Sequence, residues 1–499
     1  MSAITDTRDI LRGAAALLFG FGGRIIARIL VVLVAGRLFG ATEFGILGLT
    51  AAIAEITAAI GVLGLKRSLL DMLSYNVEHG LSEAQRVVEA IIVVLVVSFA
   101  LSTVLMFLWP ILVPGHEKLL PFLFIAVPAI AFAEVALAAI KHKRIIKWDV
   151  WSRGFNEPWG FLAMTLLLFW AGIIKGGLVI AYVGSVSILA ATVGYGLLKT
   201  YGLANLLQAK PKLKNCLAIP KKSIPVGITD LGVMMLRRID ILILALFVPA
   251  SGVGIYYMVQ QLATVPQKVN TLFEPMISPV IARLHNRFDA SSIKANLIGI
   301  CRWIFVIQVA ITIPIVIFGD FVLSWFNPIF ASGGLVLAII LFAELIDGTF
   351  ITTETPLVFA NPKIPPTLIV ITLIIELVLI AVFSKLWGIE GAAFGFLIAI
   401  LCLSIGRLVM LKSRLQINVI NASYILPLVL SIIMALVLVA AKILIAPEQW
   451  WITTLIVILT IICYVLLIRK FGLSKSDRIL LRAIKQKRRR EKKARRAKQ

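Results

Sequence analysis

Charged residues are scarce in this chain of 499 residues. Asp, Glu, Lys and Arg make up 15% of it and hydrophobic residues 60%, against roughly 25% and 45–50% in soluble domains. A soluble protein of this size would need two or three cores joined by polar linkers. Instead, apolar runs of about twenty residues recur from residue 13 to residue 468, and each can cross the roughly 30 Å core of a bilayer as a helix. The sequence therefore predicts a polytopic membrane protein.

Cysteine and histidine are also few, at four residues each. The cysteines are widely separated and show no CxxC or CxxH spacing, which supports neither a disulfide framework nor a zinc motif. The histidines are equally dispersed, so a metal centre would need ligands from separate segments. We expect neither a metal nor a cofactor.

Acidic residues are outnumbered by basic ones. The chain has 49 Lys and Arg against 25 Asp and Glu, a formal charge of +24, which would indicate nucleic-acid binding if it lay on a soluble face. Thirteen of the basic residues lie in the tail 475–499 and most others flank apolar runs, which is how membrane proteins mark their cytoplasmic side. We expect no nucleic-acid partner, and we expect the tail to bind anionic lipid headgroups.

Fourteen segments are predicted to span the membrane. Their approximate ranges are 13–36, 42–65, 85–109, 119–140, 154–173, 177–198, 225–248, 252–275, 295–318, 333–353, 365–387, 389–411, 423–445 and 450–468. An even number places both termini on one side. That side holds 39 Lys and Arg and the opposite side five, so the positive-inside rule predicts cytoplasmic termini.

A short internal repeat indicates duplication. Residues 38–46 align with residues 247–255 at an offset of 209, and the same offset pairs Arg28 with Arg237. Each copy lies in the turn after the first span of a six-span set, and parallel repeats are a transporter architecture. We therefore expect an all-α bundle with four parts: a six-helix lobe in 1–209, a second six-helix lobe in 210–415, two extra helices in 416–472 and a basic tail in 473–499.

Four arginines lie inside predicted spans. Arg24 and Arg28 share a small-residue face of the first span, and Arg237 and Arg238 lie near the middle of the seventh. A charge at such depth costs about 2.5–3.5 kcal/mol or more unless it is solvated or paired. One hypothesis is that both helices direct guanidinium groups into a central aqueous cavity that binds an anionic group such as a diphosphate.

The alternative for these arginines is structural. Arg237 would pair with Asp230 or Asp240 on its own helix, and Arg24 would reach the membrane interface with its long side chain. The cavity hypothesis is favoured because Arg24 and Arg28 have no carboxylate three or four residues away.

Other polar residues lie inside the predicted spans. One face of the eighth span either contacts a sugar-rich substrate or holds helices together; it carries Gln260, Gln267 and Asn270. Carboxylates at this depth are candidates for coupling to a proton or a sodium ion, namely Glu55, Glu344, Asp347 and Glu376. Glu344 and Asp347 share a face, so their repulsion would favour proton uptake by one of them. Pairing with a basic residue on a neighbouring helix is the alternative.

The layout of the spans and the arginine-bearing faces of the first and seventh spans resemble those of a known family. Together with the turn Arg37-Leu38-Phe39-Gly40-Ala41-Thr42-Glu43-Phe44-Gly45, they resemble polysaccharide-type flippases of the multidrug/oligosaccharidyl-lipid/polysaccharide exporter superfamily, over the chain up to about residue 472. The resemblance implies that an undecaprenyl-diphosphate-linked glycan moves from the cytoplasmic to the outer leaflet of the plasma membrane, by alternating access between two lobes, for surface polysaccharide synthesis.

The resemblance also implies roles for individual residues. Arg24, Arg28, Arg237 and Arg238 would meet the diphosphate and sugar while the prenyl tail stays in lipid. The lipid II branch carries an Arg-Asp pair in its first helix, where this chain has Val31 and Val32. This difference argues against a peptidoglycan substrate.

Two other functions stay open. A cation-coupled multidrug antiporter of the same superfamily would need an acidic cavity, whereas the cavity expected here is at least as basic as acidic. A membrane glycan polymerase or glycosyltransferase would need a sizeable outer loop or an acidic metal-binding motif, but the predicted outer loops are short and no Asp-x-Asp occurs. We expect a transporter rather than an enzyme, with glycan polymerase and glycosyltransferase machinery as candidate partners.

Overall fold

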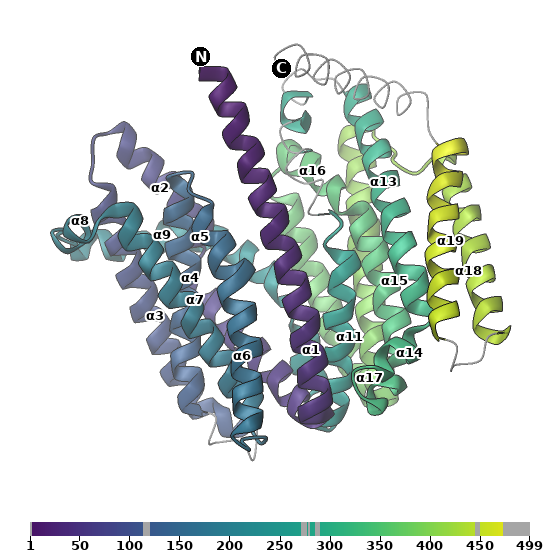
Figure 1. The fold of residues 1–499 in the computed structure, drawn as a ribbon. Coiled ribbons are helices and arrows are strands. Elements are labelled where there is room, and N and C mark those ends of the chain that lie inside the picture. Colours follow the sequence, from purple (N-terminus) through teal and green to yellow (C-terminus); the bar gives the residue numbers. More distant parts are fainter. Residues whose placement is uncertain are drawn as a thin grey trace, which may run out of the picture. The chain divides into compact units, whose positions relative to one another are not determined.

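The computed structural model describes the backbone of residues 2–112, 120–270, 277, 280–284, 290–444 and 450–472. Side chains are described over the same ranges, except those of residues 2–22, 24, 25, 111, 112, 120, 121 and 450. The side chain of Arg24 and the predicted lipid-binding tail therefore lie outside the described residues. Every regular element within the described ranges is a helix (Figure 1).

The helices follow one another with short connections. Up to residue 267 they are α1 (Ser2–Val62), α2 (Leu65–Glu78), α3 (Glu83–Leu112), α4 (Leu120–His142), α5 (Lys147–Asp149), the π-helix η2 (Val150–Asn156), α6 (Glu157–Trp170), α7 (Gly177–Tyr201), α8 (Leu203–Leu207), α9 (Leu213–Met235), α10 (Ile239–Leu244) and α11 (Ala250–Gln267). From residue 290 they are α13 (Ala290–Ile317), α14 (Gly319–Ser324), η4 (Pro328–Gly333), α15 (Gly334–Phe350), η5 (Ile351–Thr353), α16 (Glu354–Ala360), α17 (Ile364–Leu415), η6 (Ala422–Tyr424), α18 (Ile425–Leu444) and α19 (Trp450–Phe471).

Within the described ranges, nine helical segments are long and apolar enough to cross a membrane. The chain is therefore an all-helical polytopic membrane protein. One of these segments, Ile26–Glu78, comprises most of α1 and all of α2, and another, Ile364–Leu415, is α17. α1 and α17 each cover two of the expected spans. The expected seventh span is divided between α9 and α10. The total of fourteen spans stays a prediction.

Both long helices change direction at a glycine. In α1, Gly40 has φ 76° and ψ 178°, and in α17, Gly388 has φ 58° and ψ −131°. A side chain disfavours these positive φ values, so glycine permits a sharp bend without a long loop. The sequence places span boundaries at the same two positions, between residues 36 and 42 and between residues 387 and 389.

The chain forms two compact units. Unit 1 comprises Met1–Val259, Leu323–Ser332 and Ile369–Gly395, and unit 2 comprises Gln260–Val322, Gly333–Leu368 and Phe396–Gln499. The lobes expected at 1–209 and 210–415 stay a prediction.

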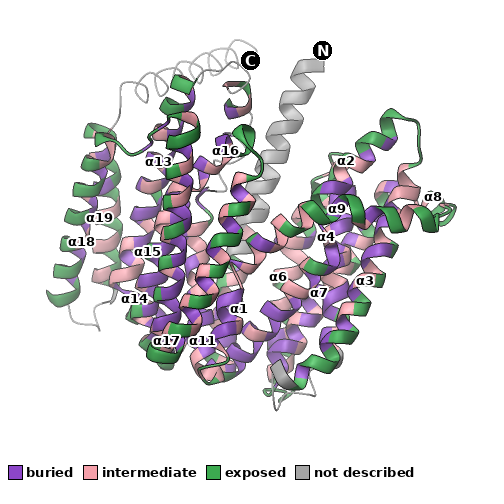
Figure 2. Cartoon of the chain, turned by 180° about the vertical axis from the view of Figure 1, so that it is seen from behind, coloured by how far each residue is buried: buried purple, intermediate pink, exposed green. Residues whose placement is uncertain are grey.

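The core of unit 1 is formed by residues of α1, α2, α3, α4, α7 and α9, which pack together (Figure 1). Its members are mostly alanine, valine and leucine, with Trp109 fully buried on α3. Figure 2 shows the buried residues on the faces that these helices turn toward one another and exposed residues on their outer faces. Phe107 is 79% exposed and Trp170 is 87% exposed. Large apolar side chains on an outer face are expected where lipid is the solvent.

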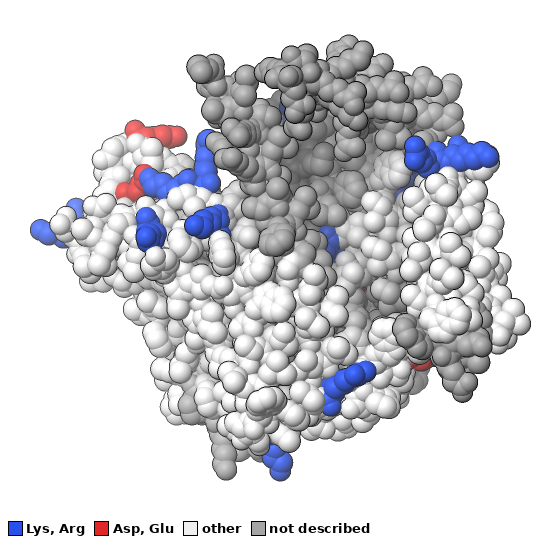
Figure 3. Space-filling model, viewed as in Figure 1, with Lys and Arg blue, Asp and Glu red and all other residues white. Residues whose placement is uncertain are grey.

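Charged side chains are sparse on the face of the molecule that Figure 3 shows. Figure 3 shows wide stretches of uncharged residues between a few groups of Lys and Arg. Such a surface is consistent with a protein whose sides lie in hydrocarbon.

The two copies of the internal repeat pack against each other inside unit 1. A Cβ atom added at Gly45 would overlap the carbonyl oxygen of Ala250, and one added at Gly254 would overlap the carbonyl oxygen of Ala41. The offset of 209 relates Gly45 to Gly254 and Ala41 to Ala250, so each copy makes the same contact with the other. Close approach of two helix backbones needs small residues at the crossing.

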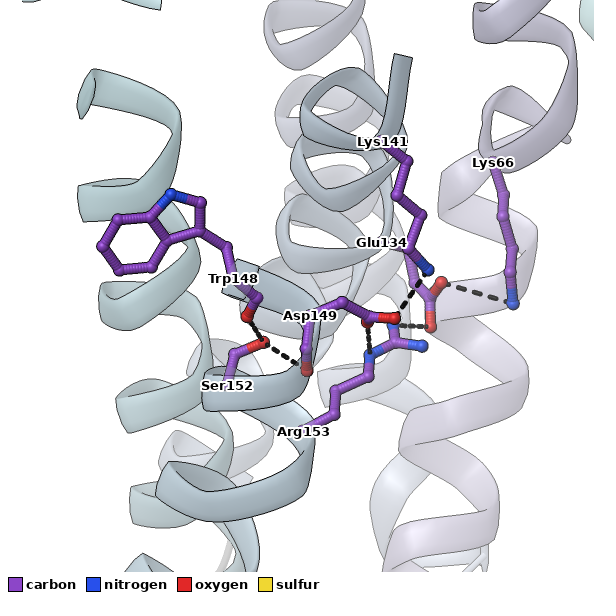
Figure 4. A network of polar contacts seen from close by, with 7 residues as sticks. All are labelled: Lys66, Glu134, Lys141, Trp148, Asp149, Ser152 and Arg153. Carbon is purple, nitrogen blue, oxygen red and sulfur yellow. Dashed lines mark hydrogen bonds and ion pairs between the residues drawn. The ribbon is translucent and has the colours of Figure 1, made fainter. Parts of the chain in front are cut away.

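A network of charged side chains joins α2, α4, α5 and η2 in unit 1 (Figure 4). Glu134 pairs with Arg153 at 2.6 Å and with Lys66 at 3.4 Å. Asp149 pairs with Lys141 at 2.9 Å and lies 3.9 Å from Arg153. The Ser152 hydroxyl in η2 donates to the Trp148 carbonyl in α5 at 2.6 Å. Glu134, a carboxylate inside the fourth predicted span, is thus held by basic residues of neighbouring elements.

Glu134→Ala is expected to destabilise unit 1 by roughly 1–3 kcal/mol, because Arg153 loses its closest carboxylate while about a quarter of its side chain still reaches solvent. Thermal unfolding of the detergent-solubilised chain measures the effect. Lys66→Ala is the control and should cost less than about 1 kcal/mol, since the Lys66 side chain is 53% exposed. Equal losses for the two variants would contradict a central role for the Glu134 to Arg153 pair.

Candidate functional site

The expected seventh span is interrupted at the two arginines predicted to bind substrate. α9 ends at Met235 and α10 begins at Ile239, and the turn between them contains Arg237 and Arg238. Arg238 has φ −138° and ψ −19°, so its backbone leaves the helical conformation. A helix broken at membrane depth is tolerated where the backbone is surrounded by protein or lines a water-filled cavity, and transporters use such breaks to place binding groups.

Arg238 is paired with a carboxylate from a distant part of the sequence. Its Nε donates at 2.8 Å to Oε2 of Glu55, which lies in the part of α1 that follows the bend at Gly40. The Arg238 side chain is 19% exposed and the Glu55 side chain 23% exposed. The ion pair thus holds both groups in position while part of each side chain stays exposed.

Two tyrosines complete a group that we call the Arg238 cluster, namely Glu55, Tyr182, Arg238 and Tyr257. Tyr182 on α7 and Tyr257 on α11 both interact electrostatically with Glu55 and with Arg238. The Tyr257 ring also packs against Phe44, with centroids 5.2 Å apart. A guanidinium near two phenol groups offers several donors to an anion or to a polyhydroxylated ligand.

The other described arginines predicted to bind substrate lie near this cluster or near a buried acid. Arg28, half-buried on α1, interacts electrostatically with Tyr257. Arg237 interacts with Glu376 of α17. The side chains of Arg28, Arg237 and Arg238 are therefore all in unit 1 with Glu55 and Glu376.

Glu376 is the most isolated of the predicted coupling carboxylates. It is 1% exposed, and neither of its carboxylate oxygens accepts a hydrogen bond from a described residue. Its electrostatic neighbours are Asp240 and Arg237. Asp240 is fully buried, accepts from the Tyr256 hydroxyl at 2.9 Å and accepts from the backbone N–H of Ile241 at 2.8 Å.

The acids proposed as local partners of Arg237 have other contacts. Asp230 pairs with Arg67 of α2 at 3.1 Å, and Asp240 makes the bonds to Tyr256 and Ile241 described above. Arg238 pairs with Glu55, which lies 183 residues away in sequence. Spacing within one helix could not have indicated that pair.

The remaining predicted residues lie in unit 2. Nε2 of Gln267 donates to Oε1 of Glu344 at 3.1 Å, so a residue predicted to bind substrate contacts one predicted to couple an ion. Asn270 is 9% exposed just beyond α11, and its Oδ1 accepts no hydrogen bond from a described residue. Gln260 is half-buried on α11.

Asp347 belongs to a buried ion triad. Arg407 of α17 pairs with Asp347 at 2.7 Å and with Glu354 at 2.9 Å, and the side chains of Arg407 and Asp347 are 6% and 3% exposed. A carboxylate held this way has a basic partner on a neighbouring helix, which is the alternative that the sequence left open for it. Glu344 and Asp347 therefore have separate partners although they share a face of α15.

Sequence analysis missed three features of this site: the helix break at residues 236–238, the pairing of Arg238 with Glu55, and the two tyrosines. One signal was available for the tyrosines. Tyr182 and Tyr257 lie several residues inside predicted spans, whereas tyrosines without a buried role tend to lie at membrane interfaces.

Comparison with solved structures shows which known folds this chain resembles. The fold is similar to the lipid II flippase MurJ in its inward closed conformation, with TM-score 0.73, 14% identity, and coverage of 92% of this chain and 99% of that one. It is also similar to a multidrug resistance MATE family transporter of the MOP superfamily in its inward-facing conformation, with TM-score 0.66, 12% identity, and coverage of 79% and 94%. An outward-facing structure of a MATE family transporter gives TM-score 0.54 at 14% identity, covering 82% and 95%. The chain thus has the fold of MOP-superfamily membrane transporters.

The family follows from the sequence itself. The sequence model of the family described as polysaccharide biosynthesis protein matches residues 10–285, more than half of the chain. The chain belongs to this family, and its fold is that of membrane transporters. No curated protein matches it.

Proposed function

We propose that this protein is a flippase that moves a polyprenyl-diphosphate-linked oligosaccharide from the cytoplasmic to the outer leaflet of the plasma membrane by alternating access, with both termini in the cytoplasm. The observation that carries the proposal is the Arg238 cluster, in which a guanidinium at a helix break is both positioned and partly accessible. Membership of a polysaccharide biosynthesis family supports a glycan cargo.

The geometry fits the parts of such a substrate. The guanidinium of Arg238 presents N–H donors that match phosphate oxygens. The hydroxyls of Tyr182 and Tyr257 can donate to or accept from sugar hydroxyls. Arg28 and Arg237 add positive charge near Tyr257 and Glu376, which favours a ligand with more than one negative charge.

Coupling to an ion is assigned within the same proposal to Glu376 rather than to Asp347. Glu376 is buried and accepts no hydrogen bond from a described residue, so binding a proton or a cation would relieve the cost of its charge. Asp347 already has Arg407 as its partner. The basic tail 473–499 is proposed to bind anionic lipids, and glycan polymerase or glycosyltransferase machinery stays a proposed partner.

Arg28→Ala combined with Arg237→Ala tests the function in cells. In the native host, this double variant should abolish delivery of the lipid-linked glycan and surface polysaccharide should be lost, while protein levels stay normal, because two of the positive charges that would meet the diphosphate are removed. Arg414→Ala with Arg469→Ala is the matched control, since both residues are exposed and outside the cluster. Unchanged surface polysaccharide in the first double variant would discredit the assignment, and resistance of the host to cationic drugs that depends on the protein would favour the multidrug antiporter.

A further inference from the structure

We infer that Glu55 and the anionic ligand compete for Arg238, and that Glu55 takes up one proton each time the ligand displaces it. The inference rests on the proposed function, because it assumes an anionic ligand at the Arg238 cluster. It goes beyond that function by giving Glu55 the task of coupling diphosphate binding to proton binding.

The pair is built for exchange rather than for permanent support. Among the described residues, Glu55 forms one ion pair, the 2.8 Å contact with Nε of Arg238. The Glu134 to Arg153 pair in the same unit is different, since Lys66 also holds Glu134 and Asp149 also lies beside Arg153. With about a fifth of each side chain accessible, a phosphate oxygen can approach the guanidinium and replace the carboxylate.

Displacement would leave Glu55 in unfavourable surroundings. The groups in electrostatic contact with the pair are Tyr182 from α7, Tyr257 from α11 and Asp240 from α10. Glu157 of α6 interacts electrostatically with Tyr182. Arg28, in the part of α1 before the bend at Gly40, interacts electrostatically with Tyr257. Among these neighbours Glu55 has no second cation as close as Arg238, so a displaced carboxylate would face the diphosphate with its charge uncompensated.

Proton uptake resolves this conflict. The Arg238 N–H group transfers its hydrogen bond from the Glu55 carboxylate to a phosphate oxygen, and the guanidinium stays protonated. Glu55 accepts a proton from water and becomes a neutral carboxylic acid. One diphosphate and one proton therefore bind together, and release of the diphosphate restores the ion pair and returns the proton.

Proton uptake on binding makes the affinity for the diphosphate depend on pH. When binding takes up one proton, affinity falls about tenfold for each unit of pH increase. A terminal phosphate group itself loses its last proton near pH 6, so wild type and Glu55→Gln are titrated side by side above that pH. Glu55→Gln removes the competing charge, so its affinity should change less with pH than that of wild type and should be about tenfold or more higher.

The experiment is calorimetric titration of geranylgeranyl diphosphate into the full-length, detergent-solubilised chain. Repeating the titration in two buffers of different ionisation enthalpy counts the protons taken up. Wild type should take up about one proton per diphosphate and Glu55→Gln about none. Glu55→Asp keeps a carboxylate and should keep the uptake. Glu83→Gln is the matched control, since Glu83 is a carboxylate of similar exposure that pairs with Lys143 at 2.8 Å away from the cluster, and it should behave as wild type.

The outcomes separate this inference from the proposed function. Binding without proton uptake in wild type, or with equal uptake in wild type and Glu55→Gln, would overturn the exchange and leave the flippase proposal in place. Absence of diphosphate binding in wild type and in every folded variant would count against the proposed function, and the exchange would fall with it.

Discussion

Arg238→Ala is expected to slow flipping of a diphosphate-linked glycan by about 10- to 150-fold. A hydrogen bond between charged groups contributes roughly 1.5–3 kcal/mol, and each 1.4 kcal/mol corresponds to a factor of ten. The substitution also leaves the negative charge of Glu55 without its partner at the position that the diphosphate would occupy. The rate is measured in proteoliposomes, as the loss of dithionite-accessible fluorescence from a labelled polyprenyl-diphosphate glycan. Arg238→Lys should be intermediate, because it keeps the charge but loses the planar set of donors.

Two companion variants show whether the loss arises at the cluster. Arg238→Ala combined with Glu55→Gln should recover part of the rate, since the repelling carboxylate is gone. Arg67→Ala removes an arginine whose side chain is 65% exposed and which pairs with Asp230, and it should flip at close to the wild-type rate. A wild-type rate in Arg238→Ala would show that the substrate does not use this guanidinium.

Gly45→Ala is expected to destabilise unit 1 strongly. The added Cβ would overlap the carbonyl oxygen of Ala250, which belongs to a helix backbone and cannot rotate away as a side chain can. Overpacking of this kind costs about 1–3 kcal/mol and occasionally more. Thermal unfolding in detergent should show a lowered midpoint. Gly254→Ala should give a similar loss, because it makes the equivalent contact with Ala41.

Gly299→Ala is the control for these two variants. Gly299 lies within α13 and a Cβ added there has no atom within 4 Å, so alanine should be neutral or stabilise the helix by up to about 1 kcal/mol. If Gly45→Ala and Gly254→Ala unfold at the temperature of Gly299→Ala, the two copies of the repeat do not pack as closely as described.

Hydropathy predicted much of the fold because it reports the length of apolar segments. The boundary between the eleventh and twelfth spans was placed at residue 388, where Gly388 bends α17, and the first boundary was placed around Gly40, which bends α1. The helix that contains the start of the seventh predicted span is longer than the span. α9 begins at Leu213 rather than near residue 225, because lysines lower the hydropathy of its first turns without preventing a helix.

The candidate site could be predicted only in part. Arginines inside apolar runs stand out because of their cost in a membrane, so Arg28, Arg237 and Arg238 could be selected from the sequence. Their partners could not be selected, because Glu55 approaches Arg238 through the packing of α1 against a broken helix and no local spacing encodes that contact. The same limit applies to Asp347, whose partner Arg407 lies 60 residues further along the chain.

Reconstituted transport tests the central claim most directly. Purified wild-type protein in liposomes should move a labelled polyprenyl-diphosphate oligosaccharide between leaflets much faster than empty liposomes do, and should not accumulate a cationic dye under the same ion gradients. A rate no greater than that of empty liposomes, together with gradient-dependent uptake of the dye, would contradict a flippase and identify a cation antiporter on the same fold.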